Sequence, residues 1–181
     1  MAIQSPVTLD EMKDHLRITH TDDDQYINAL CLAATSWAEK FQNRTYVKRP
    51  RTMVLDKFPL IIRPKYPPLI SVTSIVYVDL DGVSQTLAAS QYRVDTVTEP
   101  GRITEAYETT WPDIRDVTNA VTITYSAGYG TEAKVPDEVK AAIKLMVGHL
   151  YEHREAVSEI KMEKVPMSVQ HLLWLEKLVI V

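Results

Sequence analysis

The chain has 181 residues, with 20 basic and 24 acidic side chains and a formal net charge of −4 at pH 7. This length suffices for one domain, or for one domain with a modest insertion. The acidic balance argues against a protein that binds nucleic acid over its whole surface, because such proteins carry a basic excess. Cys31 is the one cysteine, so no disulfide can form within the chain.

No apolar run approaches the roughly 18 residues that indicate a membrane span. The first residues, "MAIQSPVTLDEMKDHL", lack the basic and apolar regions of a signal peptide. We therefore expect no membrane partner and a protein that is made and kept in a cytoplasm, or in a particle assembled there.

Two helices are expected near the start of the chain. Thr8 and Glu11 have the spacing of a capping box, which predicts a helix over residues 9–16. Asp22 is the expected cap of a second helix over residues 23–42, in which apolar residues recur at helical spacing. Cys31 lies beside this apolar stripe and is expected to be a small buried side chain.

The pattern changes to strands between residues 45 and 125. Short runs rich in Val, Ile, Thr and Tyr alternate there with Pro, Gly or Asp, which is typical of strands and turns. Asp81-Gly82 predicts a hairpin turn. Pro64, Pro67 and Pro68 predict an extended connector or a sheet edge. The strand-like runs are "TMVLDKF", "ISVTSIVYVDL", "SQTLAASQYRVD", "GRITEAY" and "AVTITYSAG".

Helical spacing returns at Pro136, which suits the first position of a helix expected to end near Val157. Pro166 opens a last short helix. We therefore expect an α+β fold whose long N-terminal and C-terminal helices pack together, with a central, mostly antiparallel β-rich segment inserted between them. The expected division is a helical core of residues 1–44 and 131–181 and an inserted β-rich region of residues 45–130.

Two motifs suggest an enzyme. Gly128, Gly130 and Ala133 fit a G-x-G-x-x-A phosphate loop, but the helix that should follow begins too late, which favours a simple turn. "HLYEH" matches H-x-x-E-H, in which His149 and His153 would bind zinc and Glu152 would act as the base. The third zinc ligand would come from Glu155, Glu159 or Glu163. A zinc-dependent hydrolase therefore remains an alternative.

The charges are unevenly distributed. Residues 44–66 hold seven bases and one acid, a balance of +6, and residues 95–116 hold six acids and two bases, a balance of −4. These can be ordinary solvated surfaces, or the basic 44–65 segment can bind DNA. They can also be complementary faces of neighbouring copies, which close into a ring when the contact repeats. The candidate interface residues are Arg44, Lys48, Arg49 and Arg51 on one side and Glu105, Glu108, Asp113 and Asp116 on the other.

The C-terminal "LLWLEKLVIV" is strongly apolar for a chain end. Exposed apolar surface usually marks an interface. We expect the part from Trp174 onward to dock on a neighbouring subunit or another protein rather than to join the core of its own subunit. The candidate docking residues are Trp174, Leu175, Leu178 and Ile180.

The ordered set of segments resembles the head–tail connector (adaptor) proteins of long-tailed double-stranded DNA bacteriophages. It comprises "VTLDEMKDHLRITHTDDDQYINALCLAATSWAEKFQNRTYV", "YPPLISVTSIVYVDLDG", "YRVD", "GRI", "WP", "VTITYSAGYG", "VPDEVKAAIKLMVGHLYEHRE" and "VPMSVQHLL". The chain departs from this family in continuing with "WLEKLVIV" after "LL".

The resemblance implies a structural protein with no catalytic activity and no cofactor or metal. Such connectors sit at the head–tail junction of the virion, which is assembled in the cytoplasm of the bacterial host. They form a homo-oligomeric ring, often dodecameric, beneath the portal protein. The ring extends the DNA channel, through which DNA passes without sequence-specific binding, and it presents a surface to the next head-completion or tail-terminator protein.

Overall fold

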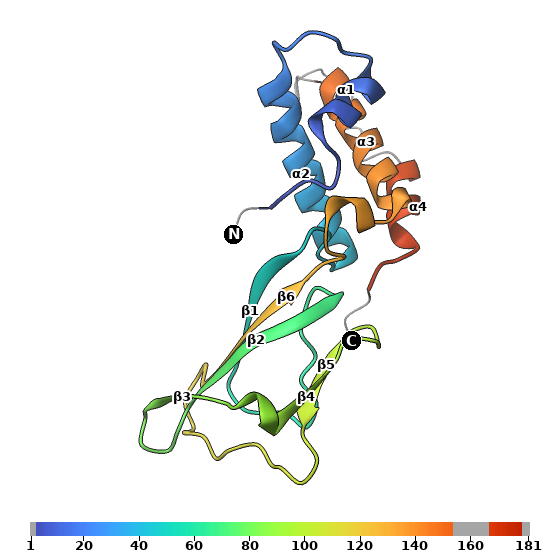
Figure 1. The fold of residues 1–181 in the computed structure, drawn as a ribbon. Coiled ribbons are helices and arrows are strands. Elements are labelled where there is room, and N and C mark those ends of the chain that lie inside the picture. Colours follow the sequence, from blue (N-terminus) through green and yellow to red (C-terminus); the bar gives the residue numbers. More distant parts are fainter. Residues whose placement is uncertain (1–2, 154–166, 179–181) are drawn as a thin grey trace. The chain divides into compact units, whose positions relative to one another are not determined.

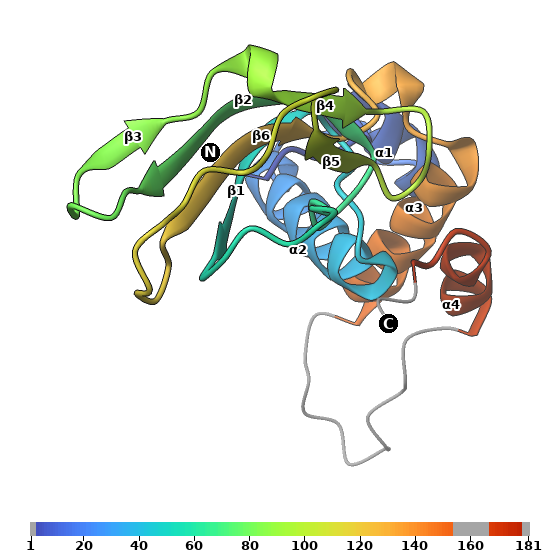
Figure 2. The same cartoon turned by 90° about the horizontal axis from the view of Figure 1, so that it is seen from below.

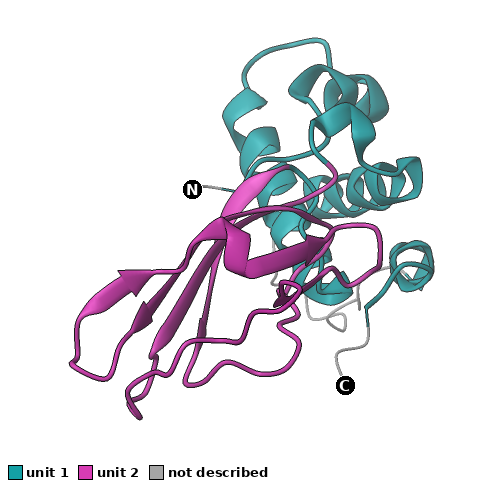
Figure 3. Ribbon diagram, turned by 60° about the horizontal axis from the view of Figure 1, so that its bottom comes forward, with its two compact units in different colours: residues 1–47, 130–181 teal, residues 48–129 magenta. Residues whose placement is uncertain are grey.

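The computed structural model of the chain describes residues 3–153 and 167–178. These form two compact units, one of residues 1–47 and 130–181 and one of residues 48–129 (Figures 1 and 3). The first unit is helical and the second is built from strands. The expected α+β fold, with terminal helices packing together and a central antiparallel sheet, is confirmed. Over the described residues no helix has the length and apolar character to cross a membrane.

The helical unit contains α1 (Leu9–Leu16), α2 (Asp24–Gln42), α3 (Asp137–Glu152) and α4 (Met167–Trp174), with a short 3-10 turn, η2 (Glu132–Lys134), before α3. The predicted capping box at α1 is confirmed. The Glu11 amide donates to Thr8 Oγ1 at 3.2 Å, and the Thr8 amide donates to Glu11 Oε2 at 3.0 Å. Two main-chain N–H groups that the helix cannot satisfy itself are thus bonded at its first turn.

Helix α2 packs against α3 through small and branched side chains. Ala34 and Ala38 of α2 and Ala142 of α3 are almost fully buried, and such small residues let two helices approach closely. Cys31 is buried in the same stripe, as predicted. Burial raises the pKa of its thiol to about 11, so the thiol remains protonated and unreactive at neutral pH.

The start of α2 differs from the prediction by one residue. Asp23 rather than Asp22 holds the N-cap position, and its side chain makes no capping hydrogen bond. Instead, Asp23 Oδ2 accepts a hydrogen bond from Tyr151 Oη of α3 at 2.5 Å. Asp24, in the first turn, forms an ion pair with Lys13 of α1 at 2.8 Å. These carboxylates therefore join α2 to its neighbouring helices, which a local capping pattern does not reveal.

The strand unit has a four-stranded antiparallel sheet and a separate two-stranded ribbon. The sheet contains β1 (Arg49–Leu55), β2 (Leu69–Val78), β3 (Ser84–Thr86) and β6 (Val121–Ala127) in the order β1-β6-β2-β3 (Figure 2). The ribbon pairs β4 (Tyr92–Asp95) with β5 (Arg102–Glu105). The strand-like run over residues 84–95 is thus split between the two sheets. Between β3 and β4 lies a 3-10 turn, η1 (Ala89–Gln91), because Ala, Ser and Gln favour strands only weakly.

Strand β6 lies between β1 and β2 and alternates buried and half-buried residues along its length. Its buried side chains join those of the neighbouring strands and of Ile62 and Ile103, which pair across an isolated antiparallel bridge. The buried core of the unit comprises Ile62, Leu69, Ile75, Leu87, Ile103, Val121, Ile123, Tyr125 and Ala127.

The predicted hairpin turn joins β2 to β3. Gly82 has φ +87°, which a residue with a side chain rarely adopts. The Asp79 carboxylate accepts hydrogen bonds from the Val83 amide and from Gln85 Nε2, both at 2.8 Å. These bonds stabilise the ionised form, so the pKa of Asp79 lies below its usual range.

The two ends of the strand unit connect to the helical unit at adjacent points. Val47, which precedes β1, and Gly130, which follows β6, form a parallel β-bridge within the helical unit. The chain therefore leaves and re-enters the helical unit at neighbouring positions.

Replacing Thr8 by alanine removes the side-chain half of the capping box. We expect Thr8→Ala to lower the free energy of unfolding by about 0.5–2 kcal/mol, the usual cost of losing such a cap. Urea unfolding monitored by circular dichroism measures this. Thr19→Ala, at an exposed loop position, is the matched control and should change the free energy by less than about 0.5 kcal/mol. Equal stability of the two variants would contradict the role of the cap.

Candidate functional site

The four basic candidates for a subunit interface differ in their exposure. Arg44, in the helical unit, is 7% exposed, and its Nε donates to the Glu176 carbonyl at 2.6 Å. Arg49, in β1, is 8% exposed. The Arg51 guanidinium lies 4.5 Å from the centre of the Tyr66 ring, whereas Lys48 is exposed. Arg44 and Arg49 thus belong mainly to the interior of their own units, and Lys48 and Arg51 are the better placed for a neighbour.

Part of the acidic segment is bonded within the strand unit. Glu105 Oε1 accepts a hydrogen bond from the Trp111 amide at 2.7 Å, and Asp116 forms an exposed ion pair with Lys57 at 3.2 Å. Glu108 and Asp113 are exposed. The basic and acidic segments therefore already meet within one subunit at Lys57 and Asp116, in addition to any contact between copies.

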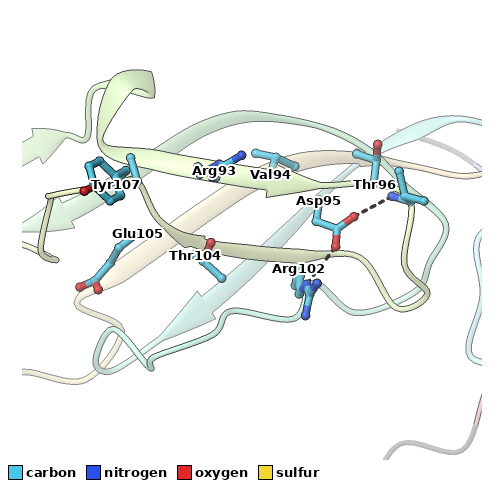
Figure 4. A pocket seen from close by; sticks show the side chains of 10 residues that line it. Arg93, Val94, Asp95, Thr96, Arg102, Thr104, Glu105 and Tyr107 are labelled. Atoms are coloured by element: carbon cyan, nitrogen blue, oxygen red, sulfur yellow. Dashed lines mark hydrogen bonds and ion pairs between the residues drawn. The ribbon is translucent and has the colours of Figure 1, made fainter.

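The ribbon of β4 and β5 presents an open surface whose loop is fixed by one carboxylate (Figure 4). Asp95 Oδ1 accepts from the Val97 and Thr98 amides at 2.9 and 3.2 Å. Asp95 Oδ2 accepts from Thr98 Oγ1 at 2.8 Å and from Arg102 Nε at 2.9 Å. The bonds to Val97 and Thr98, and then the one to Arg102, hold the pKa of Asp95 well below its usual range.

These hydrogen bonds hold the loop in one conformation, in which the Val97 side chain is 93% exposed. None of the sequence motifs described above predicts this loop. The signal was available in the spacing of Asp95, Thr98 and the following Pro100-Gly101, which is typical of a side chain that bonds the main chain of a turn.

The glycine loop after β6 has a structural role. Gly128 and Gly130 have φ values of +125° and +112°, and the Gly128 amide donates to the Pro68 carbonyl at 2.9 Å. The η2 turn then separates the loop from α3. The loop therefore turns the chain, as expected, and is not followed directly by the helix that a phosphate site requires.

The H-x-x-E-H motif lies at the end of α3. The His149 and His153 rings lie 4.5 Å apart between centroids, and His153 Nδ1 lies 2.9 Å from the His149 carbonyl oxygen. Across the residues that the structure describes, no group of three His, Cys, Asp or Glu side chains is placed to bind a metal. The candidate third ligands, Glu155, Glu159 and Glu163, lie outside the described residues, as does the expected helix end at Val157.

The end of α2 binds the main chain of the C-terminal segment. Gln42 Nε2 donates to the Leu173 carbonyl at 2.7 Å, and the Leu178 amide donates to the Gln42 carbonyl at 3.0 Å. Asn43 Nδ2 donates to the Leu178 carbonyl at 3.0 Å. Gln42 is itself buried and accepts from Tyr46 Oη at 2.7 Å. The main chain of this segment is therefore bound to its own subunit up to Leu178, and the docking of its side chains on a partner stays a prediction.

The side chains of the same segment are less enclosed. Trp174 is 63% and Leu175 78% exposed, and with Met167, at 73%, they are the most exposed large apolar residues described in the helical unit. Leu178 is half-buried, and Ile180 lies outside the described residues. Lys177 Nζ lies 4.4 Å from the Phe41 ring centre and 4.7 Å from that of Trp174. A main chain fixed to α2 thus displays Trp174 and Leu175 to solvent.

Comparison with known proteins finds one family match, in the N-terminal part of the chain. Residues 6–68 match the family model described as "Phage gp6-like head-tail connector protein". This stretch spans α1, α2 and β1, and the match confirms the resemblance read from the sequence there. The comparison with curated proteins finds no significant match.

Three solved structures contain chains of the same fold. The first, "Neck of empty GTA particle computed with C6 symmetry", has a TM-score of 0.78 and 24% identity, covering 97% of this chain and 91% of that one. The second, "Virion of native gene transfer agent (GTA) particle", has a TM-score of 0.80 and 22% identity, covering 100% of this chain and 94% of that one. The third, "Neck of native GTA particle computed with C12 symmetry", has a TM-score of 0.73 and 24% identity, covering 96% of this chain and 89% of that one.

The Asp95 network predicts a loop that resists acid. Because the pKa of Asp95 is depressed in the folded chain, its contribution to stability is present above the unfolded value, about 3.9, and is lost only as the pH falls through the folded value. We expect the Val97 and Thr98 amides to stay protected from hydrogen exchange at pH 4. Asp95→Asn should accelerate their exchange several-fold, whereas Asp113→Asn, at an exposed site, should not. Equal exchange in both variants would contradict the network.

Proposed function

We propose that this chain, which matches the phage gp6-like head–tail connector family over residues 6–68 and has the fold of chains in gene transfer agent necks, is a structural neck protein of a phage-like particle. The observation that carries the proposal is the agreement of a family match with a fold that extends over nearly the whole chain. The chain then acts at the head–tail junction as a connector and not as an enzyme.

The finer proposal is a homo-oligomeric ring beneath the portal protein. The neck structures that contain the similar chains were computed with sixfold and twelvefold symmetry, which supports a ring for this chain as well. A ring on the portal extends the DNA channel and offers its far side to a head-completion or tail-terminator protein. DNA passes through such a ring without sequence-specific contacts.

Within this proposal charged side chains, exposed except for the half-buried Arg51, orient neighbouring copies. Lys48 and Arg51 on one copy face Glu108, Asp113 and Asp116 on the next. Exposed ion pairs each contribute only about 0–1 kcal/mol, so they guide the approach of subunits rather than hold the ring. Arg44 and Arg49 support their own units and take no direct part.

The C-terminal segment supplies a docking surface for the portal or a neighbouring subunit. Trp174 and Leu175 are its contact residues among those described, and Leu178 and Ile180 extend it. The main chain up to Leu178 is already ordered on α2, which lowers the conformational entropy that docking must overcome.

The function is tested by removing the gene from a genome that encodes the particle. We expect DNA-filled heads without tails, and expression of the intact chain should restore tailed particles. Electron microscopy of purified particles distinguishes the two. Tailed, infectious particles at the normal yield in the absence of the protein would contradict the proposal. Stoichiometric bound zinc together with a hydrolytic activity lost in Glu152→Ala would favour the zinc hydrolase instead.

The docking surface is tested by a pair of substitutions in the same segment. Leu175→Glu changes an exposed side chain and should leave the free energy of unfolding within about 0.5 kcal/mol of the parent while reducing tail joining. Leu173→Ala, at a fully buried position, should instead lower the free energy of unfolding by about 2–5 kcal/mol. Normal joining by the Leu175→Glu protein would exclude this residue from the docking surface.

A further inference from the structure

The two edge strands of the four-stranded sheet, β1 and β3, have main-chain groups that the described part of the chain does not pair. Strand β1 pairs with β6 alone and β3 with β2 alone (Figure 2). The side chains of Thr52, Val54, Ser84 and Thr86 are exposed along these edges. Unpaired N–H and C=O groups at a sheet edge are a template for another strand.

The register shows which groups of β1 point outward. The Gly128 amide donates to Pro68 and the Ala120 carbonyl accepts from Val78, so even-numbered residues of β6 bond toward β2. Odd-numbered residues of β6 therefore bond toward β1, where their partners are Arg49, Arg51, Met53 and Leu55. Thr52 and Val54 then direct their N–H and C=O groups outward. Pro50, which has no N–H to donate, also falls at an outward position, as expected of proline in an edge strand.

The same reasoning applies to β3. The Leu87 amide donates to the Ile75 carbonyl, and the Asp79 amide donates to the Val83 carbonyl. Residues 83, 85 and 87 therefore bond toward β2. Ser84 and Thr86 direct their main-chain groups to the free edge.

We propose that in the ring β3 of one copy pairs antiparallel with β1 of the next copy, so that their sheets are continuous. This inference rests on the proposed function, since it requires a repeated contact between copies. A sheet of four antiparallel strands has edge strands that run in opposite directions. In this sheet the residues that bond outward at both edges, Thr52 and Val54 in β1 and Ser84 and Thr86 in β3, have their side chains on the same, exposed face. A second copy added with its strands in the same orientation therefore meets an antiparallel partner with the matching face.

One register satisfies both edges. Thr86 lies opposite Thr52 of the neighbouring copy and Ser84 lies opposite Val54, and each pair can exchange both of its main-chain hydrogen bonds. A shift of two residues in one direction places Thr86 opposite Pro50, which cannot donate. A shift in the other direction places Ser84 opposite Asp56, which lies beyond the end of β1. The Asp56 carboxylate accepts a hydrogen bond from the Asn119 amide of its own chain.

Charge supports the same partner. Residues 48–55 hold no acid and three bases, of which Lys48 is exposed, Arg51 half-buried and Arg49 buried, and residues 79–92 hold two acids and no base. The Arg115 guanidinium, which lies beside Gly82, offsets part of the acidic charge at the turn. Continuing the register past β1 brings Lys57 of the neighbouring copy next to Asp81, and both side chains are exposed. Like-charged edges would oppose this pairing, whereas these edges favour it.

The first test separates the main chain of Thr86 from its side chain. Thr86→Pro removes an outward N–H while leaving the bonds between β3 and β2 intact, and Thr86→Ala keeps that N–H. We expect Thr86→Ala to assemble normally and Thr86→Pro to need at least about tenfold more protein for half-maximal ring formation, measured by mass photometry or on particles by electron microscopy. Rings of the proline variant at the parent's concentration, with normal folding, would overturn the proposal.

The second test holds even if the proline variant fails to fold. In a Cys31→Ala background, Thr52→Cys and Thr86→Cys are combined, because directly opposed residues in a sheet have the Cα separation that a disulfide needs. Mild oxidation of assembled protein should give a ladder of linked chains on a non-reducing gel. Either cysteine alone, or Thr52→Cys with Val97→Cys, should give none.

The two proposals fail in distinguishable ways. Absence of any oligomer of the unmodified chain, free or in particles, contradicts the ring itself. Oligomers of the double-cysteine chain that form normally but yield no ladder contradict the strand pairing and leave the connector function in place.

Discussion

The strand unit depends on the hydrogen bonding of β6 with strands on both sides. Its even-numbered residues bond toward β2 and its odd-numbered residues toward β1, while its side chains alternate between the core and the other face. The ladder between β6 and β1 is unbroken, and a slip of one residue there would move every core side chain of β1 to the opposite face. The ladder between β6 and β2 has two register shifts, between Leu69 and Ser71 and between Val72 and Ser74, which β2 absorbs as irregularities. The register of β6 therefore decides which side chains form the core and which groups each edge exposes.

A second constraint positions the C-terminal segment up to Leu178. Gln42 is buried and uses its amide on both sides, accepting from Tyr46 and donating to Leu173. An unpaired buried amide is costly, so Gln42 favours one position for the C-terminal segment. The helical unit thus combines an ordered main chain with exposed apolar side chains in a single short segment.

Local patterns predicted local structure well. The capping box of Thr8 and Glu11 located the start of α1, and Asp81-Gly82 located the β2–β3 turn, because in each case the determining contacts lie within a few residues. Asp23 was missed as the cap of α2 because its carboxylate bonds Tyr151, which is remote in the sequence. The sequence predicts a single strand-like run over residues 84–95, because strand propensity does not reveal which sheet each half joins.

The same distinction applies to the candidate site. The charge pattern located the basic and acidic segments, but it could not show that Arg44 and Arg49 are buried, since burial depends on contacts made by the complete fold. Composition singled out the apolar C-terminal segment, but it could show neither the exposure of Trp174 and Leu175 nor the anchoring of their main chain, which requires Asn43 and Gln42 to lie beside residues 173–178. The outward groups of β1 and β3 depend on register, which the sequence specifies only through the assembled sheet.

The bridge between Val47 and Gly130 has a consequence for how such a protein can change over evolution. Because the chain leaves and re-enters the helical unit at neighbouring positions, the helices need only a short span between those positions, whatever lies beyond it. Strands can then be lengthened, shortened or exchanged without altering the packing of α2 against α3. The helical unit can thereby stay constant while the inserted sheet changes in length and sequence.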